Sequence, residues 1–256
     1  MKPIECAVNP YRFTDDPPAM VAFLEELGMR KAVTTSGDWF GLLRAGAGWV
    51  GVHRASTDPE GSPAGQTQLV LLAGDARSAA DMLEEQGVPA TVWDESYGRH
   101  AGVVDPAGGG VWINEHQADL YGYIGHDGEA DPGLSVTMVR ASADREADRA
   151  FFARFGFVPE PGGNEWWQAL RASEYSGVIG LHKPMPGEVP HAATPAPFAE
   201  RTSTVRLGFQ TSEELEALAE RLDRAGYPAR VVSEQVTAVY VVDPDGCELE
   251  IHPASA

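Results

Sequence analysis

The sequence predicts an α+β fold in which one unit, a strand followed by a helix and three more strands, occurs four times. Two observations predict this fold. The halves of the chain resemble each other at an offset of 128 residues, which aligns Phe23 with Phe151. In addition, the pattern VVDPAGGGVWINE in residues 103–115 recurs as VVDPDGCELEIHP in residues 241–253. Such repeats are typical of supersecondary units that bury their apolar faces against neighbouring copies.

Each copy of the unit contains one amphipathic segment. Four helices are therefore predicted, in residues 15–29, 74–88, 142–157 and 211–227. The first and third have acidic N-cap candidates and end at Gly28 and Gly156. The fourth opens with a capping box from Thr211 to Glu214, in which each side chain would bond the other residue's backbone N–H.

Short β-rich runs lie on both sides of these helices, such as QTQLVLLA before the second helix and TAVYVVD after the fourth. The second half has about ten extra residues between His182 and the turn at Asp243, supplied by the proline-rich segment 183–200. The repeat is therefore a duplication with one expanded loop.

The chain resembles the vicinal oxygen chelate superfamily in three features: the four units, the helix ends FLEELGM and FFARFGF, and the final hairpin on DPDG-x-x-x-E. This superfamily includes glyoxalase I, extradiol dioxygenases, fosfomycin resistance enzymes and bleomycin-binding proteins. The resemblance covers nearly the whole chain and implies two half-open barrels, or cups, in tandem, each built from two units. We expect an N-terminal domain in residues 1–118, a linker in 119–132 and a C-terminal domain in 133–256.

The composition excludes several classes of function. With 43% hydrophobic and 22% charged residues, the chain resembles a soluble globular protein, and no apolar run approaches the roughly 18 residues of a membrane span. A formal net charge of −19 would repel phosphate backbones and anionic lipids, which argues against nucleic-acid and membrane partners. Cys6 and Cys247 lack the spacing of a disulfide framework or zinc site. We expect a cytoplasmic monomer or homodimer whose partner is a small molecule.

In metal-dependent members of the superfamily, His, Glu or Gln side chains project into the cup from the first and last strands of each unit. There they hold a divalent cation that keeps open positions for substrate oxygens. The resemblance implies that the matching positions of the first half are Asn9 or a neighbour within two residues, Gly51, Gln68 and Trp112. In the second half they are Thr137, Gly180, Arg206 or its neighbour, and Glu250. Because only Gln68 and Glu250 are ligand types, we expect no metal in either cup.

One alternative metal site stays open in the second half. Side chains two residues apart on a strand share a face, so His182 would point as Gly180 does and His252 as Glu250 does. His182, Glu250 and His252 would then form a 2-His-1-carboxylate set for one divalent metal. Otherwise they are polar cup residues or surface groups.

Aromatic side chains suggest what fills the cups instead. Six tryptophans fall in predicted strands, and such side chains line pockets for planar organic ligands as well as packing cores: Trp39, Trp49, Trp93, Trp112, Trp166 and Trp167. Trp112 stands where the superfamily has its glutamate. It either floors an apolar pocket or plugs the first cup.

From these residues we predict a metal-independent protein that binds a small aromatic or cationic molecule. By resemblance to the bleomycin-resistance type, it would sequester an antibiotic-like ligand in resistance or natural-product metabolism. The predicted ligand-binding residues are Trp39, Trp112, Trp166, Trp167, His53, Gln68, Arg206, Glu250 and His252.

Two other functions stay open. One is a superfamily enzyme, either a lyase, an isomerase or a dioxygenase, that works in the second cup. Glu250, with its pKa raised by aromatic surroundings, would serve as base or metal ligand, and His182 would assist. The other is a protein-interaction module with vestigial cups.

Overall fold

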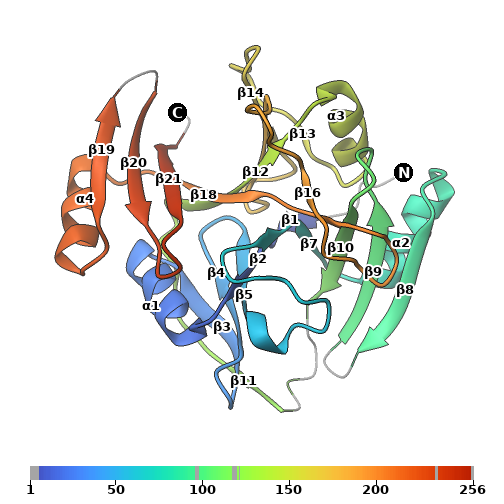
Figure 1. Ribbon diagram of the computed structural model, residues 1–256, viewed down its shortest axis with the longest axis horizontal. Coiled ribbons are helices and arrows are strands. Elements are labelled where there is room, and N and C mark those ends of the chain that lie inside the picture. Colours follow the sequence, from blue (N-terminus) through green and yellow to red (C-terminus); the bar gives the residue numbers. More distant parts are fainter. Residues whose placement is uncertain (1–5, 96–97, 117–119, 121, 234–235, 255–256) are drawn as a thin grey trace.

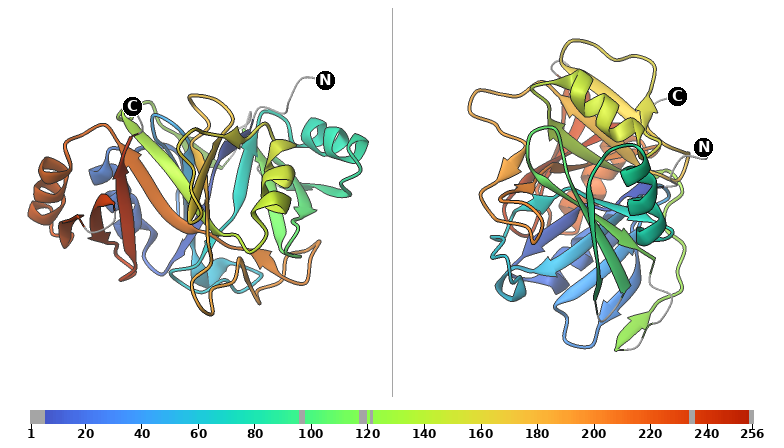
Figure 2. Two further views of the ribbon diagram at one scale, coloured as in Figure 1. Left: turned by 90° about the horizontal axis from the view of Figure 1, so that it is seen from above. Right: turned by 90° about the vertical axis from the view of Figure 1, so that its right-hand side faces the viewer.

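The computed structural model describes residues 6–95, 98–116, 120, 122–233 and 236–254. Within them it has four α-helices, one in each predicted unit: α1 (Pro17–Leu27), α2 (Ala76–Glu85), α3 (Arg145–Ala153) and α4 (Leu215–Arg224). Figure 1 shows α4 and α2 at opposite ends of the molecule, and the left view of Figure 2 shows the same separation. Among the described residues, no helix is both long and apolar enough to span a membrane.

Local sequence explains where the helices start and stop. The side chain of Asp16 accepts a hydrogen bond from the Ala19 N–H at 3.1 Å, and proline occupies the first turn of α1. Gly28 ends α1 with a φ of 111°, a left-handed conformation that glycine adopts without strain. Phe23 and Leu24 bury the apolar face of α1 completely. The expected helix positions are thereby confirmed.

The predicted capping box of α4 is wrong. Helix α4 begins at Leu215 after Glu214, whose side chain makes no capping hydrogen bond. Thr211 is instead the last residue of a strand, where it pairs with Leu134, and its hydroxyl accepts from the Glu213 N–H at 3.0 Å. The threonine is committed to the sheet and therefore cannot also cap the helix.

The strands form three sheets within the described residues. One has six strands in the order β11-β3-β4-β5-β2-β6: β11 (Tyr123–Gly125), β3 (Arg30–Thr35), β4 (Phe40–Arg44), β5 (Trp49–Arg54), β2 (Tyr11–Thr14) and β6 (Thr67–Gln68). A second, seven-stranded sheet contains β1 (Cys6–Val8), β7 (Val70–Ala73), β8 (Ala90–Glu95), β9 (Gly98–Val104), β10 (Gly110–Glu115), β17 (Thr202–Ser203) and β16 (His191–Ala192). These two sheets form the walls of the first-half cup.

The second half forms one sheet of eight strands in the order β13-β14-β15-β12-β18-β21-β20-β19. Their bounds are β13 (Val158–Pro159), β14 (Trp167–Arg171), β15 (Val178–His182), β12 (Leu134–Ala141), β18 (Arg206–Thr211), β21 (Glu248–Pro253), β20 (Thr237–Val242) and β19 (Ala229–Ser233). Parallel pairing of β12 with β15 and of β18 with β21 joins the first and last strands of each unit.

Two segments expected to be loops contribute strands. Strand β11, in the predicted linker 119–132, pairs antiparallel with β3, so this segment extends the first-half sheet. The expanded segment of the second half leads through β16 to β17, which lies parallel to β10. The domain boundary predicted at residues 118 and 119 lies outside the described residues.

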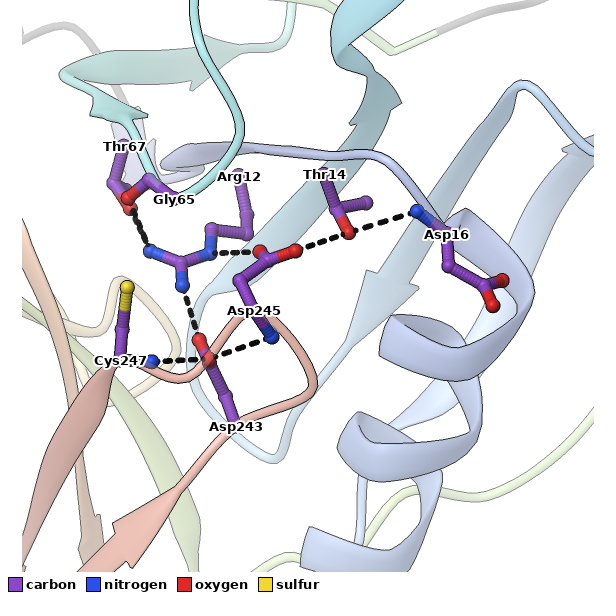
Figure 3. Close-up of polar contacts among 8 residues, drawn as sticks. All are labelled: Arg12, Thr14, Asp16, Gly65, Thr67, Asp243, Asp245 and Cys247. Carbon is purple, nitrogen blue, oxygen red and sulfur yellow. Dashed lines mark hydrogen bonds and ion pairs between the residues drawn. The ribbon is translucent and has the colours of Figure 1, made fainter.

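Two buried arginines join the halves of the chain. Arg12 on β2 pairs with Asp243 and, at 3.1 Å, with Asp245, both in the turn between β20 and β21 (Figure 3). Arg140 on β12, which stands 128 residues later, pairs with Asp105 at 2.9 Å in the turn between β9 and β10. Each repeated DP turn is therefore docked on the first strand of the opposite half.

The Arg140 pair allows a test of this docking. Arg140 is fully buried and also pairs with Asp148 at 3.1 Å, so Arg140→Met would leave two buried carboxylates without their counter-charge. We expect the variant to lose about 3–5 kcal/mol of unfolding free energy in urea titrations. Arg99→Met, which removes an exposed ion pair with Asp94, is the control and should change stability little. Equal losses in both variants would contradict the structural role of Arg140.

Candidate functional site

Two adjoining cavities lie in the first-half cup. The larger, here called the aromatic cavity, has a volume of about 220 Å³ and is lined by Tyr11, Phe13, Trp39, His53, Trp112 and other residues. The smaller, here called the asparagine cavity, has a volume of about 130 Å³ and includes Asn9 and Trp49. Both cavities share Tyr11, His100 and Asn114. Their walls come from both sheets of the first half, so the cup is a candidate binding site of two adjoining parts.

Strand alternation explains why these side chains converge. Trp112 and Asn114 lie two apart on β10 and therefore face the same way, as do Asn9 and Tyr11 across the break between β1 and β2. Tyr11 is in register with Gly51 and Gln68. A Cβ atom at Gly51 would stand 2.4 Å from the Tyr11 ring, so the ring can occupy this position only because residue 51 is glycine.

Tyr11 is fixed at the centre of the cup. The side-chain amide of Asn114 donates a hydrogen bond to the Tyr11 hydroxyl at 2.8 Å. Burial raises the pKa of Tyr11 well above its ordinary value, so the phenol stays protonated and its own O–H is a neutral donor. Burial also lowers the pKa values of His53 and His100, which leaves both imidazoles uncharged at neutral pH.

Carboxylates form one side of the aromatic cavity. Asp58, Glu60 and Glu95 line it, and none of its described lining residues is lysine or arginine. Burial, and then the neighbouring carboxyl of Asp58, raise the pKa of Glu60 to about 7. The cavity therefore combines aromatic walls with negative charge, and the amount of this charge changes near neutral pH.

Several polar atoms in the cup are buried without a hydrogen-bond partner in the structure. They are both carboxamide atoms of Asn9, the carboxamide oxygen of Asn114 and the indole Nε1 of Trp112. Unsatisfied buried groups are uncommon in folded proteins, and each needs an explanation such as a ligand or bound water. Here they gather at the cavities.

A side chain from the second half covers part of this cup. Phe198, in the expanded segment, lies with its ring centroid 5.2 Å from that of Trp112 and 5.6 Å from that of Trp93. A Cβ atom at Gly102 would stand 2.3 Å from the Phe198 ring, so the ring lies directly on β9. Trp112 lines the aromatic cavity, which stays open beside this cluster.

The structure brings four of the predicted ligand-binding residues together in the aromatic cavity: Trp39, His53, Gln68 and Trp112. Trp39 and Trp166 are not in strands as predicted, because each lies in a turn one residue before its strand. Trp166 is 49% exposed, and the Lys183 ammonium lies 4.3 Å from its ring centroid.

The remaining predicted residues lie in the second half, where Glu250 is already paired, whereas the Nδ1 of His182 is buried without a hydrogen-bond partner. His252 lies 3.1 Å from Glu250, and Arg206 lies 3.8 Å from the same carboxylate. The hydrogen bond from His252 lowers the pKa of Glu250, so the raised value expected for this carboxyl is wrong. Trp167 lies over Gly180, where a Cβ atom would be 1.8 Å from the indole, and so fills this part of the second cup.

Neither cup offers the donors of a divalent metal site. At the matching positions the first half has Tyr11, Gly51, Gln68 and Trp112, and the Gln68 amide is bonded to Ser62 at 2.9 Å. In the second half Val139, not Thr137, is in register with Gly180 and Arg206. The guanidinium of Arg206 beside Glu250 supplies the positive charge that a metal would otherwise bring. Within the described ranges, no three His, Cys, Asp or Glu side chains cluster as metal ligands, so His182 does not complete the alternative set.

Sequence reasoning missed the roles of Tyr11, Asn114, Glu60 and His100. Asn114 follows Trp112 by two residues and Tyr11 follows Asn9 by two, so alternation along the strands was an available signal. Glu60 lies in the loop after β5, and nothing in the local sequence indicates that this loop reaches the cavity.

Solved structures with the same architecture are known. No family model and no curated protein matches the chain. Among solved structures, a catechol 2,3-dioxygenase matches with a TM-score of 0.62 at 12% identity, covering 100% of this chain and 89% of that chain. The 2,3-dioxygenase LapB from Pseudomonas sp. KL28 matches with 0.61 at 11% identity, covering 100% and 94%. The Mn(II)-bound glyoxalase from Novosphingobium aromaticivorans matches with 0.58 at 14% identity, covering 100% and 89%. The fold predicted from the sequence is confirmed over the whole chain.

Proposed function

We propose that this chain, which has the fold of the vicinal oxygen chelate superfamily, binds a small organic cation with a flat apolar body in its first-half cup. The observation that carries the proposal is the lining of the aromatic cavity. Tryptophan, tyrosine and phenylalanine side chains stand there together with three carboxylates, and none of the described lining residues is lysine or arginine.

Both parts of this lining favour the same ligand. Aromatic faces attract cations through the ring quadrupole and bury flat apolar surface, as sites for planar ligands require. Asp58 and Glu60 are half-buried, so a bound cation would offset their negative charge, which the neutral His53 and His100 do not. The formal net charge of −19 would also raise the local concentration of cations around the protein.

The first cup is preferred to the second because aromatic rings and carboxylates line an open cavity there. In the second half Glu250 is bonded to His252, and Trp167 occupies the space above Gly180. A protein that binds such a molecule without converting it would act by sequestration, as the resemblance to bleomycin-binding proteins implies. No metal ion takes part in this proposal, because the matching cup positions lack suitable ligands.

A second candidate function is proton-transfer catalysis in the same cavity. A carboxyl with a pKa of about 7, as at Glu60, is suited to act as a general base near neutral pH. The Tyr11 hydroxyl, held by Asn114, can donate a hydrogen bond to a substrate carbonyl oxygen. The structural neighbours named above are a glyoxalase and dioxygenases, so enzymes are built on this fold. Glu250 suits this role less well, because His252 lowers its pKa.

Matched ligands test the main proposal. By calorimetry at about pH 8, we expect 2-methylisoquinolinium to bind about tenfold more tightly than uncharged isoquinoline, a difference of about 1.4 kcal/mol. Glu60→Gln should weaken binding of the cation and leave isoquinoline unchanged. Glu248→Gln, which alters a carboxylate of the second half paired with Arg230, is the control. Equal affinities for both compounds in the unaltered protein would contradict the proposal.

The pH dependence of cation binding follows from Glu60. A bound cation favours the ionised carboxylate, so the affinity should rise as pH increases from about 6 to about 8, through the pKa of about 7. His53 and His100 should not contribute, because burial lowers their pKa values. Calorimetric titrations across this range should become flat in Glu60→Gln. A slope that persists in the variant would assign the effect to another group.

Deuterium exchange tests the catalytic candidate. Phenacyltrimethylammonium carries a permanent cation, an aromatic ring and acidic C–H bonds beside a carbonyl. If Glu60 is a base, the protein should speed deuterium uptake from D₂O, measured by NMR, and Glu60→Gln should lower that rate about 10²- to 10⁴-fold. Exchange no faster than in buffer, with binding intact, would leave binding as the function.

A further inference from the structure

The asparagine cavity holds two carboxamide side chains whose hydrogen-bonding capacity is only partly used. Asn9 is 1% exposed and lies beside the Tyr11 hydroxyl, but neither its Nδ2 nor its Oδ1 makes a well-formed hydrogen bond. Asn114 is 5% exposed; its Nδ2 donates to Tyr11, whereas its Oδ1, which lies beside His100, makes no well-formed hydrogen bond. Both residues line the same cavity of about 130 Å³. A buried polar atom without a partner costs free energy, which a ligand with matching groups would recover.

The backbone fixes Asn9 in this position. The residue lies between β1 and β2 and is followed by Pro10, which has no N–H to continue the sheet. The Asn9 N–H donates to the Val70 carbonyl oxygen at 3.0 Å, so the chain leaves one sheet at this residue and joins the other. The side chain is therefore presented to the cavity by a defined break in the strand.

The charged residues beside the cavity already have partners. One carboxylate oxygen of Glu115 accepts from the Arg99 N–H at 3.0 Å, and the other accepts from the Ala76 N–H at 3.1 Å. The Arg99 guanidinium bonds to Asp94 at 2.8 Å. Asn9 and Asn114, with the Tyr11 hydroxyl and the imidazoles of His100 and His116, are therefore the neutral polar groups that line the cavity, and a neutral ligand group suits them.

The numbers of donors and acceptors define the ligand group. In either orientation of its amide, Asn9 offers one donor group and one acceptor, and Asn114 adds one acceptor. A primary carboxamide has one carbonyl oxygen and two N–H bonds, which match this set one to one. A carboxylate would satisfy only the donor, and an ammonium would satisfy only the acceptors.

We propose that the asparagine cavity is a subsite for a neutral primary carboxamide on the ligand. The cavity adjoins the aromatic cavity at Tyr11, His100 and Asn114, so one small molecule can place its ring in the first and its carboxamide in the second. This inference rests on the proposed function in that both parts would belong to one ligand.

Benzamide and acetophenone test the subsite without any positive charge. The two molecules have the same shape, but acetophenone has a CH₃ group where benzamide has NH₂. Acetophenone therefore keeps the carbonyl acceptor and lacks both N–H donors. By NMR titration we expect benzamide to bind about tenfold more tightly. In Asn9→Leu this preference should become smaller, because only the Asn114 acceptor then remains for the amide N–H. That variant should fold at least as stably as the unaltered protein, because it removes an unsatisfied buried amide.

The outcomes separate the two proposals. Equal binding of benzamide and acetophenone to the unaltered protein, or no detectable binding of either, would overturn the carboxamide subsite. A benzamide preference of unchanged size in Asn9→Leu would also overturn it. The binding of 2-methylisoquinolinium is measured independently, so the cation site can stand or fail without deciding the subsite.

Discussion

The structure depends on two buried arginine–aspartate contacts between the halves of the chain. Arg12 pairs with Asp243 and Asp245, and Arg140 pairs with Asp105 and Asp148. Burying a charge is costly, and it is tolerated here because each guanidinium meets two carboxylates and further hydrogen-bond partners. Separating the halves would break the pairs of Arg12 with Asp243 and Asp245 and the pair of Arg140 with Asp105. The first-half cup is thereby held against the second half, which lets β17 join the sheet of β10.

The duplication produces two cups that differ in what fills them. In the second, Trp167 lies over Gly180 and Glu250 is bonded to His252. In the first, Gly51 makes room for Tyr11, and Trp112 and Asn114 border open cavities. The arginine contacts are nearly symmetric, whereas the cup interiors are not. The repeated contacts hold the architecture in both halves, so one cup can be filled while the other keeps space for a ligand.

The first cup separates two kinds of recognition. Carboxylates and aromatic rings line the larger cavity, whereas two asparagines supply neutral hydrogen-bonding groups in the smaller one. Tyr11 lies where both meet, and its bond from Asn114 couples the two. Phe198 packs on Trp112 from the opposite half, so the shape of the larger cavity depends on the same docking that buries Arg140.

The sequence by itself determined the four units, the helix positions and the resemblance to the superfamily's fold. Helix caps, glycine stops and apolar periodicity are visible in short stretches of sequence. It also showed that Trp112 replaces the superfamily's glutamate. Only the tertiary structure decided that Arg12 meets Asp243, 231 residues away, and that Phe198 and Glu60 reach the first cup. No local pattern records such contacts. The site depends on which side chains remain unpaired after the halves dock, and that is a property of the folded chain.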